Sequence, residues 1–427
     1  MIKTMIKFNR TGMKVRSSVA LAILMAATNL FAQAPPEMAK EQPADPYAIG
    51  CLLPLSGKFA AAGSKTLDAI MMAFDIYKPD HKSPFKLVIE DTKGNPETAG
   101  AAVAKMVAEH RVMAILGPLG SAESQQAARA AQQLKVPIIT FTQKEKITQT
   151  GDYVFRNFLT AKKQLEALAS YAMNDAGMKR FAILYPEDMY GKEMARIFRS
   201  EVEKRKGRVA KSLSYIKGKA DFGEEIKSLT APSTVRKKRS RDAVQQEELK
   251  PEAAFAFDAL FIPDNLAMLN IFAPQLAFNN LQGIKLLGTG YWNHAPAKKQ
   301  TGEAEDSSAD AAVLEGALFA DGFSINSYVN EAGRFADAFY AAYEREPGTL
   351  EAMAYDAARI SAAIIIQQRV TSREAFRDRL LNTENYTGAT GKTSFKFSRD
   401  ARKEVFILTV KDGQIIPLKS VVDGKER

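Results

Sequence analysis

The sequence of 427 residues contains one cysteine, one tryptophan and three histidines. A single cysteine excludes an intramolecular disulfide, so the folded chain depends on its hydrophobic core. His81, His110 and His294 are far apart, and none lies in the HExxH spacing of a zinc protease. The GxSxG turn of serine hydrolases is absent, and no pair of carboxylates stands out for acid–base chemistry. We therefore expect a protein that is not an enzyme and that uses no cofactor and no metal.

The sequence also lacks the charge pattern of a nucleic-acid-binding protein. The formal net charge is +10, and residues 1–34 contribute five basic residues and no acid to it. Basic and aromatic residues do not alternate along any predicted groove. A basic run, Arg236 to Arg241, lies in an insertion over 231–250; it is either a solvated surface or a contact for an anionic partner. A second insertion covers 298–312. We expect no nucleic-acid partner.

No apolar run is long enough to span a membrane, but the N-terminus has the pattern of a secretory leader. The apolar residues 17–31 follow the basic segment and precede Ala32-Gln33-Ala34, an A-x-A cleavage signature. We expect a signal peptide over 1–34, a flexible lead-in over 35–46 and an exported, periplasmic protein.

Beyond the lead-in, predicted strands alternate with amphipathic helices. Apolar strand patterns at 47–55, 86–91 and 112–117 are each followed by a helical pattern. Two strand patterns, at 136–141 and 153–156, precede the next helix, and the alternation resumes at 180–186, 258–263 and 284–289. Repeated βα units of this kind predict parallel sheets covered by helices on both faces. Near the C-terminus, EVFILTV and QIIPL flank the turn Lys411-Asp412-Gly413, which predicts a hairpin.

The stretch GCLLPLSGKFAAAGSKT, residues 50–66, admits three interpretations. A phosphate-binding loop requires GxxxxGK[ST], but five residues separate Gly57 from Gly63 and Ser64 precedes Lys65. Lipid attachment at Cys51 is not expected, because this residue lies about 20 positions beyond the apolar run and inside a predicted strand, where a buried, inert cysteine fits. The third interpretation is a ligand loop between a strand and a helix, since ligands of open α/β sheets bind beyond the strand ends.

Several segments together resemble type I periplasmic binding proteins, the group around the leucine/isoleucine/valine receptors. These segments are IGCLLPLSGKFAAAG, EDTKGNPETAGAAVAKMV, AILGPLGSAESQQAA, VPIITFT and FAILYPEDMYGKEMA, and the likeness covers about 47–413. The resemblance implies an α/β fold of two Rossmann-like lobes, with parallel sheets joined by crossover hinge strands and a ligand in the cleft. It places lobe 1 at about 47–157 and 290–380, and lobe 2 at about 158–289 and 381–427.

The resemblance also implies ligand contacts in the first lobe. Ser121 and the Ala122 amide correspond to groups that hold a ligand carboxylate, although Ser121 can equally be a helix cap. Thr142 and Gln143 lie in the second contact loop, where the charged residues after Thr142 depart from the small residues of the family. The first loop contributes Ser56 and Phe59; Phe59 can replace a family aromatic, because Ala62 occupies its usual position.

Three further residues are implied in the second lobe. Tyr190 matches a ring that stacks on the ligand, or packs in the core. Asp264 follows FIP at the position of a group that receives an ammonium, or it caps a helix. Trp292 lines the cleft or braces the hinge.

Two functions are consistent with this resemblance. The first is a solute-binding protein of an ABC importer, with an amino acid or related small polar ligand and a permease as partners. The alternative is an envelope protein that activates a penicillin-binding protein in peptidoglycan synthesis, a branch that residues 258–292 resemble. The sequence lacks the lipid site and the helical-repeat N-terminal domain of that branch.

Overall fold

The structure is a computed structural model, and it describes residues 43–80, 82–231, 256–279, 281, 283–294, 314–422 and 425–426. The chain divides into two units, Met1–Pro43 and Ala44–Arg427. The predicted signal peptide, most of the lead-in, the basic run and the insertion over 298–312 lie outside the described residues. The first strand begins at Asp45, inside the predicted lead-in.

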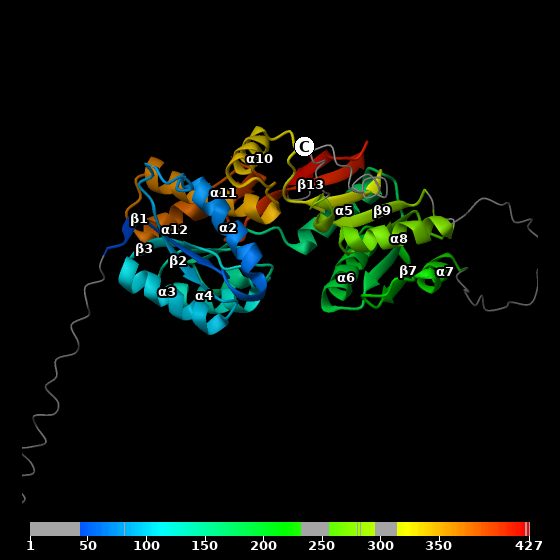
Figure 1. Ribbon diagram of the computed structural model, residues 1–427, viewed down its shortest axis with the longest axis horizontal. Coiled ribbons are helices and arrows are strands. Elements are labelled where there is room, and N and C mark those ends of the chain that lie inside the picture. The colour runs from blue at the N-terminus through cyan, green and yellow to red at the C-terminus, as the bar shows by residue number, and fades with distance from the viewer. Residues whose placement is uncertain are drawn as a thin grey trace, which may run out of the picture. The chain divides into compact units, whose positions relative to one another are not determined.

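The first sheet has five parallel strands in the order β2-β1-β3-β4-β5. The strands are β1 (Asp45–Leu53), β2 (Lys86–Asp91), β3 (Val112–Leu116), β4 (Ile138–Thr140) and β5 (Val154–Arg156). The helices around it are α2 (Ala60–Ala73), α3 (Pro96–His110), α4 (Ser121–Gln133), α10 (Asn330–Tyr343), α11 (Thr349–Gln367) and α12 (Arg373–Leu381) (Figure 1). Short 3-10 turns, η1 (Gly57–Phe59) and η2 (Ile147–Thr150), complete this lobe.

Alternate residues of β1 enter different cores. Ile49, Cys51 and Leu53 pack in a cluster with α2 and α11. Ala48 and Leu52 pack in another with α3 and α4. A strand covered on both faces must be apolar at every position, which explains the continuous apolar run of the sequence.

The second sheet is parallel through β7-β6-β8-β9-β10 and then antiparallel. Its strands are β6 (Arg180–Pro186), β7 (Arg208–Tyr215), β8 (Ala259–Phe261), β9 (Lys285–Thr289), β10 (Leu318–Asp321), β13 (Arg402–Lys411), β14 (Gln414–Val422) and β15 (Lys425–Glu426). β13 pairs antiparallel with β10 and β14. The helices are α5 (Ala161–Asn174), α6 (Met189–Lys204), α7 (Gly223–Thr230) and α8 (Leu266–Phe278), with the 3-10 turn η3 (Gly290–His294). The predicted hairpin after residue 410 is present.

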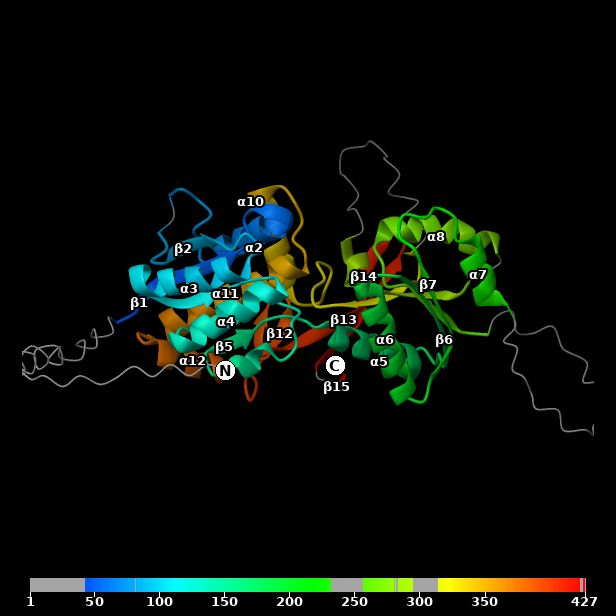
Figure 2. The ribbon, with the colours of Figure 1, turned by 90° about the horizontal axis from the view of Figure 1, so that it is seen from below.

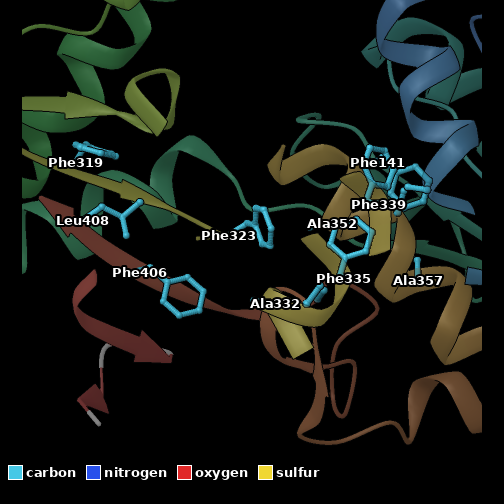
Figure 3. Close-up of a cluster of buried hydrophobic side chains, with 14 of the residues drawn as sticks. Phe141, Phe319, Phe323, Ala332, Phe335, Phe339, Ala352, Ala357, Phe406 and Leu408 are labelled. Atoms are coloured by element: carbon cyan, nitrogen blue, oxygen red, sulfur yellow. The ribbon is translucent and has the colours of Figure 1, made fainter. Parts of the chain in front are cut away.

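Three segments connect the lobes. The chain leaves β5 for α5, returns from β10 to α10, and crosses again along β13. β13 pairs with β12 (Gly391–Ser394) at its start and with β10 further on, and β12 pairs with β11 (Tyr386–Gly388) (Figure 2). Phe323, on the second crossing, lies between Phe319 and Phe335 in one continuous apolar cluster (Figure 3).

The strand pairings and ring contacts favour lobe boundaries at other residues than the sequence implied. β10 pairs with β9, so the second sheet extends past residue 289. Phe395 packs edge-to-face on Phe155 of β5, with ring centroids 5.7 Å apart, so the segment after residue 381 adjoins the first lobe. We propose boundaries near residues 158, 322 and 401 in place of those implied by the sequence. The sequence boundary at 290 followed the end of β9, because β10 is only four residues long and gives a weak strand signal.

Candidate functional site

The carboxyl ends of the parallel strands define where a ligand of this fold would bind. The chain passes to the second lobe directly after the carboxyl end of β5, and it returns to the first lobe directly after that of β10. The carboxyl edges of both sheets therefore lie at the crossings. Loops beyond strand ends are the usual ligand sites of open α/β sheets.

The loop after β1 is held by Asp91, at the end of β2. Asp91 Oδ1 accepts hydrogen bonds from the amides of Leu55 (2.8 Å), Ser56 (3.3 Å) and Lys93 (2.8 Å). Burial raises the pKa of Asp91, but the hydrogen bonds from Ser56 and these amides outweigh it and hold the pKa below its ordinary value. Ser56 and Phe59 are exposed on this fixed loop.

The loop after β3 leads into the N-terminus of α4. Glu123 is buried; it accepts from the Gly120 amide (2.6 Å) and from the Thr92 hydroxyl (2.5 Å). Gly120, and not Ser121, precedes the helix, so the capping alternative for Ser121 is corrected. Ser121 and Ala122 are exposed, and their amides have no acceptor among the described residues. This helix start can therefore donate to an anion.

Hydrogen bonds of the buried Thr142 and Arg156 side chains hold the loop after β4 in place. The Thr142 side chain is buried, and its Oγ1 accepts from the Lys144 amide (3.3 Å). Arg156, at the end of β5, donates to the Lys144 carbonyl (2.6 Å) and forms an ion pair with Asp400. Gln143 is exposed at the tip of this turn. Thr142 thus shapes the loop, whereas Gln143 can reach a ligand.

In the second lobe, the first turn of α6, after β6, and the 3-10 turn η3, after β9, bring two tyrosines together. The rings of Tyr190 and Tyr291 have centroids 5.4 Å apart and are tilted by 58°. Tyr190 is half-buried, its hydroxyl lies 3.4 Å from Thr289 Oγ1, and burial raises its pKa. Tyr291 is 50% exposed. The sequence reasoning missed Tyr291, although the adjacent Trp292 marked the segment.

Asp264, after β8, is enclosed and only 4% exposed. Its Oδ2 accepts from the buried Tyr215 hydroxyl (2.5 Å) and its Oδ1 from the Asn265 amide (2.8 Å). Burial, and then the hydrogen bond to Asp264, raises the pKa of Tyr215. The N-cap of α8 is Asn265, whose Oδ1 accepts from the Met268 amide, so the capping role expected of Asp264 belongs to its neighbour.

Trp292 packs against the backbone of the loop that carries Asp264, to which it is hydrogen-bonded. Its side chain is fully buried, and its indole Nε1 donates to the Asp264 carbonyl (2.8 Å). The ring lies against the backbone of Gly288, where a Cβ would come within 2.2 Å of it. Trp292 therefore braces the second-lobe loops.

Other observations concern the remaining predictions. Cys51 is fully buried, and burial raises its pKa to about 12. Within the described ranges, no three potential metal ligands cluster, and no helix combines the length and hydrophobicity needed to cross a membrane. Two surface hollows, of about 370 and about 550 Å³, lie beside Thr148 and beside α8; neither includes a sequence-predicted site residue.

Comparison with known proteins identifies the family. Residues 46–414 match the family described as periplasmic binding protein, so the chain belongs to this family. The recognition made from the sequence and the two-lobed α/β fold are confirmed. No curated protein sequence matches the chain.

Solved structures share the fold. A putative branched-chain amino acid ABC transporter protein from Rhodospirillum rubrum has a TM-score of 0.69 at 21% identity, over 87% of this chain and 99% of its own. The substrate-binding protein LivJ from Streptococcus pneumoniae, in complex with isoleucine, has a TM-score of 0.61 at 22% identity, over 88% and 98%. A solute-binding protein from Rhodopseudomonas palustris, in complex with 3,4-dihydroxybenzoic acid, has a TM-score of 0.64 at 18% identity, over 89% and 98%.

Proposed function

We propose that this chain is the extracytoplasmic substrate-binding protein of an ABC importer and binds a small carboxylate-bearing solute between its lobes. The observation that carries the proposal is the start of α4, where the exposed amides of Ser121 and Ala122 have no acceptor among the described residues. Isoleucine and 3,4-dihydroxybenzoic acid, bound by two proteins of this fold, share a carboxylate. An amino acid and an aromatic acid are both compatible with this group.

The predicted site residues divide into two roles under this proposal. Ser56, Phe59, Ser121, Ala122, Gln143 and Tyr190 contact the solute. Thr142, Asp264 and Trp292 are buried and hold the contact loops in place. The expected partner is an ABC permease, the expected location is the periplasm, and we expect no enzymatic activity. The comparisons give no support to activation of a penicillin-binding protein.

Thermal melting of the purified chain with amino acids, aromatic acids and muropeptides tests the proposal. A solute that binds only the folded state at a hundredfold excess over its Kd adds about 2.7 kcal/mol of stability and raises the midpoint. A shift with a carboxylate solute is the expected result. A folded protein that responds to no member of the panel would count against a receptor and direct attention to protein partners.

Ser121→Pro tests the carboxylate contact directly. Proline removes the amide at the first helical position, and Gly120 has the extended backbone (ψ 150°) that a following proline requires. We expect affinity for the solute to fall roughly 10- to 100-fold, the range for loss of a hydrogen bond to a charged group. The matched control is Ala161→Pro at the start of α5, after Thr160 with ψ 151°. Equal losses in both variants would place the carboxylate elsewhere.

A further inference from the structure

Helix α8 of the second lobe is apolar on every side, although one of its sides faces solvent. It spans 13 residues and contains no charged side chain. Leu269, Phe272 and Leu276 are buried in the core, where the ring of Phe272 lies 4.4 Å from that of Phe222 at the start of α7 (Figure 1). A surface helix normally presents charged or polar residues opposite its buried side. The outer side of α8 therefore differs from an ordinary solvated surface.

The exposed positions of α8 form one apolar stripe. They are Ala267, Ile271 (37% exposed), Pro274 and Phe278 (86% exposed). Steps of four, three and four residues place them on one line along the helix, and this is the spacing with which helices pack against other helices. The exposure of Phe278 shows that no described segment of the chain covers its ring.

A hollow of about 550 Å³ opens beside this stripe. Its walls are mostly apolar, and they include Pro274, Ala277, Leu281, Ile284 and Leu286. The two charged residues at the hollow are bonded within the chain. Lys285 Nζ donates to the Gly316 carbonyl (2.7 Å), and the Glu315 carboxylate accepts from the backbone amide of Asp412 (3.1 Å). A hollow of this size and polarity admits an aromatic side chain.

The projecting ring and the hollow lie on the same side of α8. Pro274, one turn before Phe278, belongs both to the stripe and to the wall of the hollow. A two-fold axis that passes between a projection and a hollow on one surface brings each projection to the hollow of the other copy. The outer side of α8 is thus complementary to itself.

We propose that a second copy of this chain covers α8. Phe278 of each copy is inserted in the hollow of the other, and the two apolar stripes are in contact. A second copy is the occupant that supplies both a helix with the matching stripe spacing and a ring for the hollow. Because α8 carries no charge, the contact brings no like charges together along the helices.

The contact area predicts how strong this dimer is. A buried phenylalanine side chain removes about 150–250 Å² from water. Two inserted rings and the walls that they cover supply roughly half of the about 1,200 Å² at which specific interfaces begin, and the two stripes supply more. We therefore expect a small interface and a reversible dimer.

The proposed interface lies away from the candidate ligand loops. Residues 284–286 and 315–316 at the hollow lie before or at the start of β9 and β10, so they mark the amino ends of these strands. The candidate ligand loops follow the carboxyl ends. The dimer leaves that edge uncovered, and the inference goes beyond the proposed function without depending on it.

Sedimentation equilibrium of the full chain tests the proposal. We expect the weight-average mass to rise with concentration from 46.9 kDa towards twice that value. The expected Kd is about 1–100 µM, the weak end for an interface of this size. A mass that stays at that of one copy up to about 500 µM would overturn the proposal, because the hollow would then be empty or covered by another occupant.

Two variants remove the projection and the hollow separately. Phe278→Ser deletes the ring and Ala277→Trp fills the hollow, and each should weaken the dimer at least about tenfold, because both reciprocal contacts are lost. Since Phe278 is 86% exposed, its replacement should leave the melting midpoint unchanged. Phe397→Ser, at an 87% exposed phenylalanine after β12, is the matched control and should associate as the wild type does. Wild-type association in Phe278→Ser would contradict the proposal.

A mixture of the two variants tests the reciprocal arrangement itself. The Phe278→Ser copy keeps its hollow and the Ala277→Trp copy keeps its ring, so one insertion can form between them, whereas neither variant can form one with itself. We expect the mixture to associate more than either variant alone and less than the wild type. A mixture that associates no more than its components would overturn the reciprocal insertion.

Discussion

Lys403 is a buried lysine on β13, where this strand crosses between the lobes. Its Nζ donates to Asn157 Oδ1 (3.0 Å) on the first crossing and to Thr393 Oγ1 (2.8 Å) on β12. Burial lowers the pKa of Lys403 from 10.5 to about 8, partly opposed by the charge of Asp356. Asp356 is itself fully buried; burial raises its pKa, although Ala389 and Thr390 donate to it.

The lowered pKa of Lys403 predicts a pH dependence of stability. Between about pH 8 and 10.5 the unfolded chain binds more protons at this lysine than the folded chain does, so the free energy of unfolding rises with pH. We expect the wild type to gain about 1–2 kcal/mol relative to Lys403→Met between about pH 7.5 and about pH 9.5, below the titration of ordinary tyrosines. Urea unfolding at each pH measures this difference.

Lys86→Met is the matched control for this measurement. The Lys86 side chain is 76% exposed, so its removal should leave the pH profile unchanged. A wild-type profile parallel to that of Lys403→Met would show that Lys403 titrates as an ordinary lysine.

At the scale of the element, two glycines allow helices to start against the ends of strands. A Cβ at Gly63 would lie 2.0 Å from the Pro54 carbonyl oxygen, and one at Gly191 would lie 2.2 Å from that of Pro186. The same close packing of a helical glycine against a proline carbonyl thus occurs after β1 in the first lobe and after β6 in the second. Both glycines set the position of a candidate ligand loop.

Alanine substitutions measure this close packing. Gly191→Ala and Gly63→Ala should each lower the free energy of unfolding by about 1–3 kcal/mol, because backbone must shift to admit the Cβ. Gly333→Ala, inside α10 and with no atom within 4 Å of its added Cβ, should raise it by about 0.5–1 kcal/mol. Equal effects at Gly191 and Gly333 in urea unfolding would contradict the packing account.

The same elements show what the sequence could predict. The apolar runs of β1 and β6 and the Asn95-Pro96 start of α3 are local signals, and each element is present. The helix starts at Ser121 and Asp264 were each misassigned by one residue, because Gly120 and Asn265 cap equally well on local grounds. The enclosure of Asp264 depends on Tyr215, 49 residues away, and no local pattern reports that hydrogen bond.

At the scale of the whole molecule, polar contacts tie the three crossings together. Arg156 of the first crossing pairs with Asp400 before the third. Asn157 accepts from Lys403, and Tyr328 of the second crossing donates to Glu404 (2.7 Å). Arg156, Asn157, Lys403 and Glu404 are buried, so these contacts restrict where the chain can bend. Hinge closure around a ligand requires only a few such connecting residues to move.

The central claim is that a small carboxylate binds between the lobes and brings them together. Cys51 is buried with a pKa raised to about 12, so cysteines introduced at the exposed positions Lys65 on α2 and Lys192 on α6 can be spin-labelled selectively. The measurement is the distance distribution between the two labels, with and without saturating 3-phenylpropionate, phenylalanine or leucine. The account predicts a shorter and narrower distribution with the compound that binds. Calorimetric binding with an unchanged distribution would contradict it.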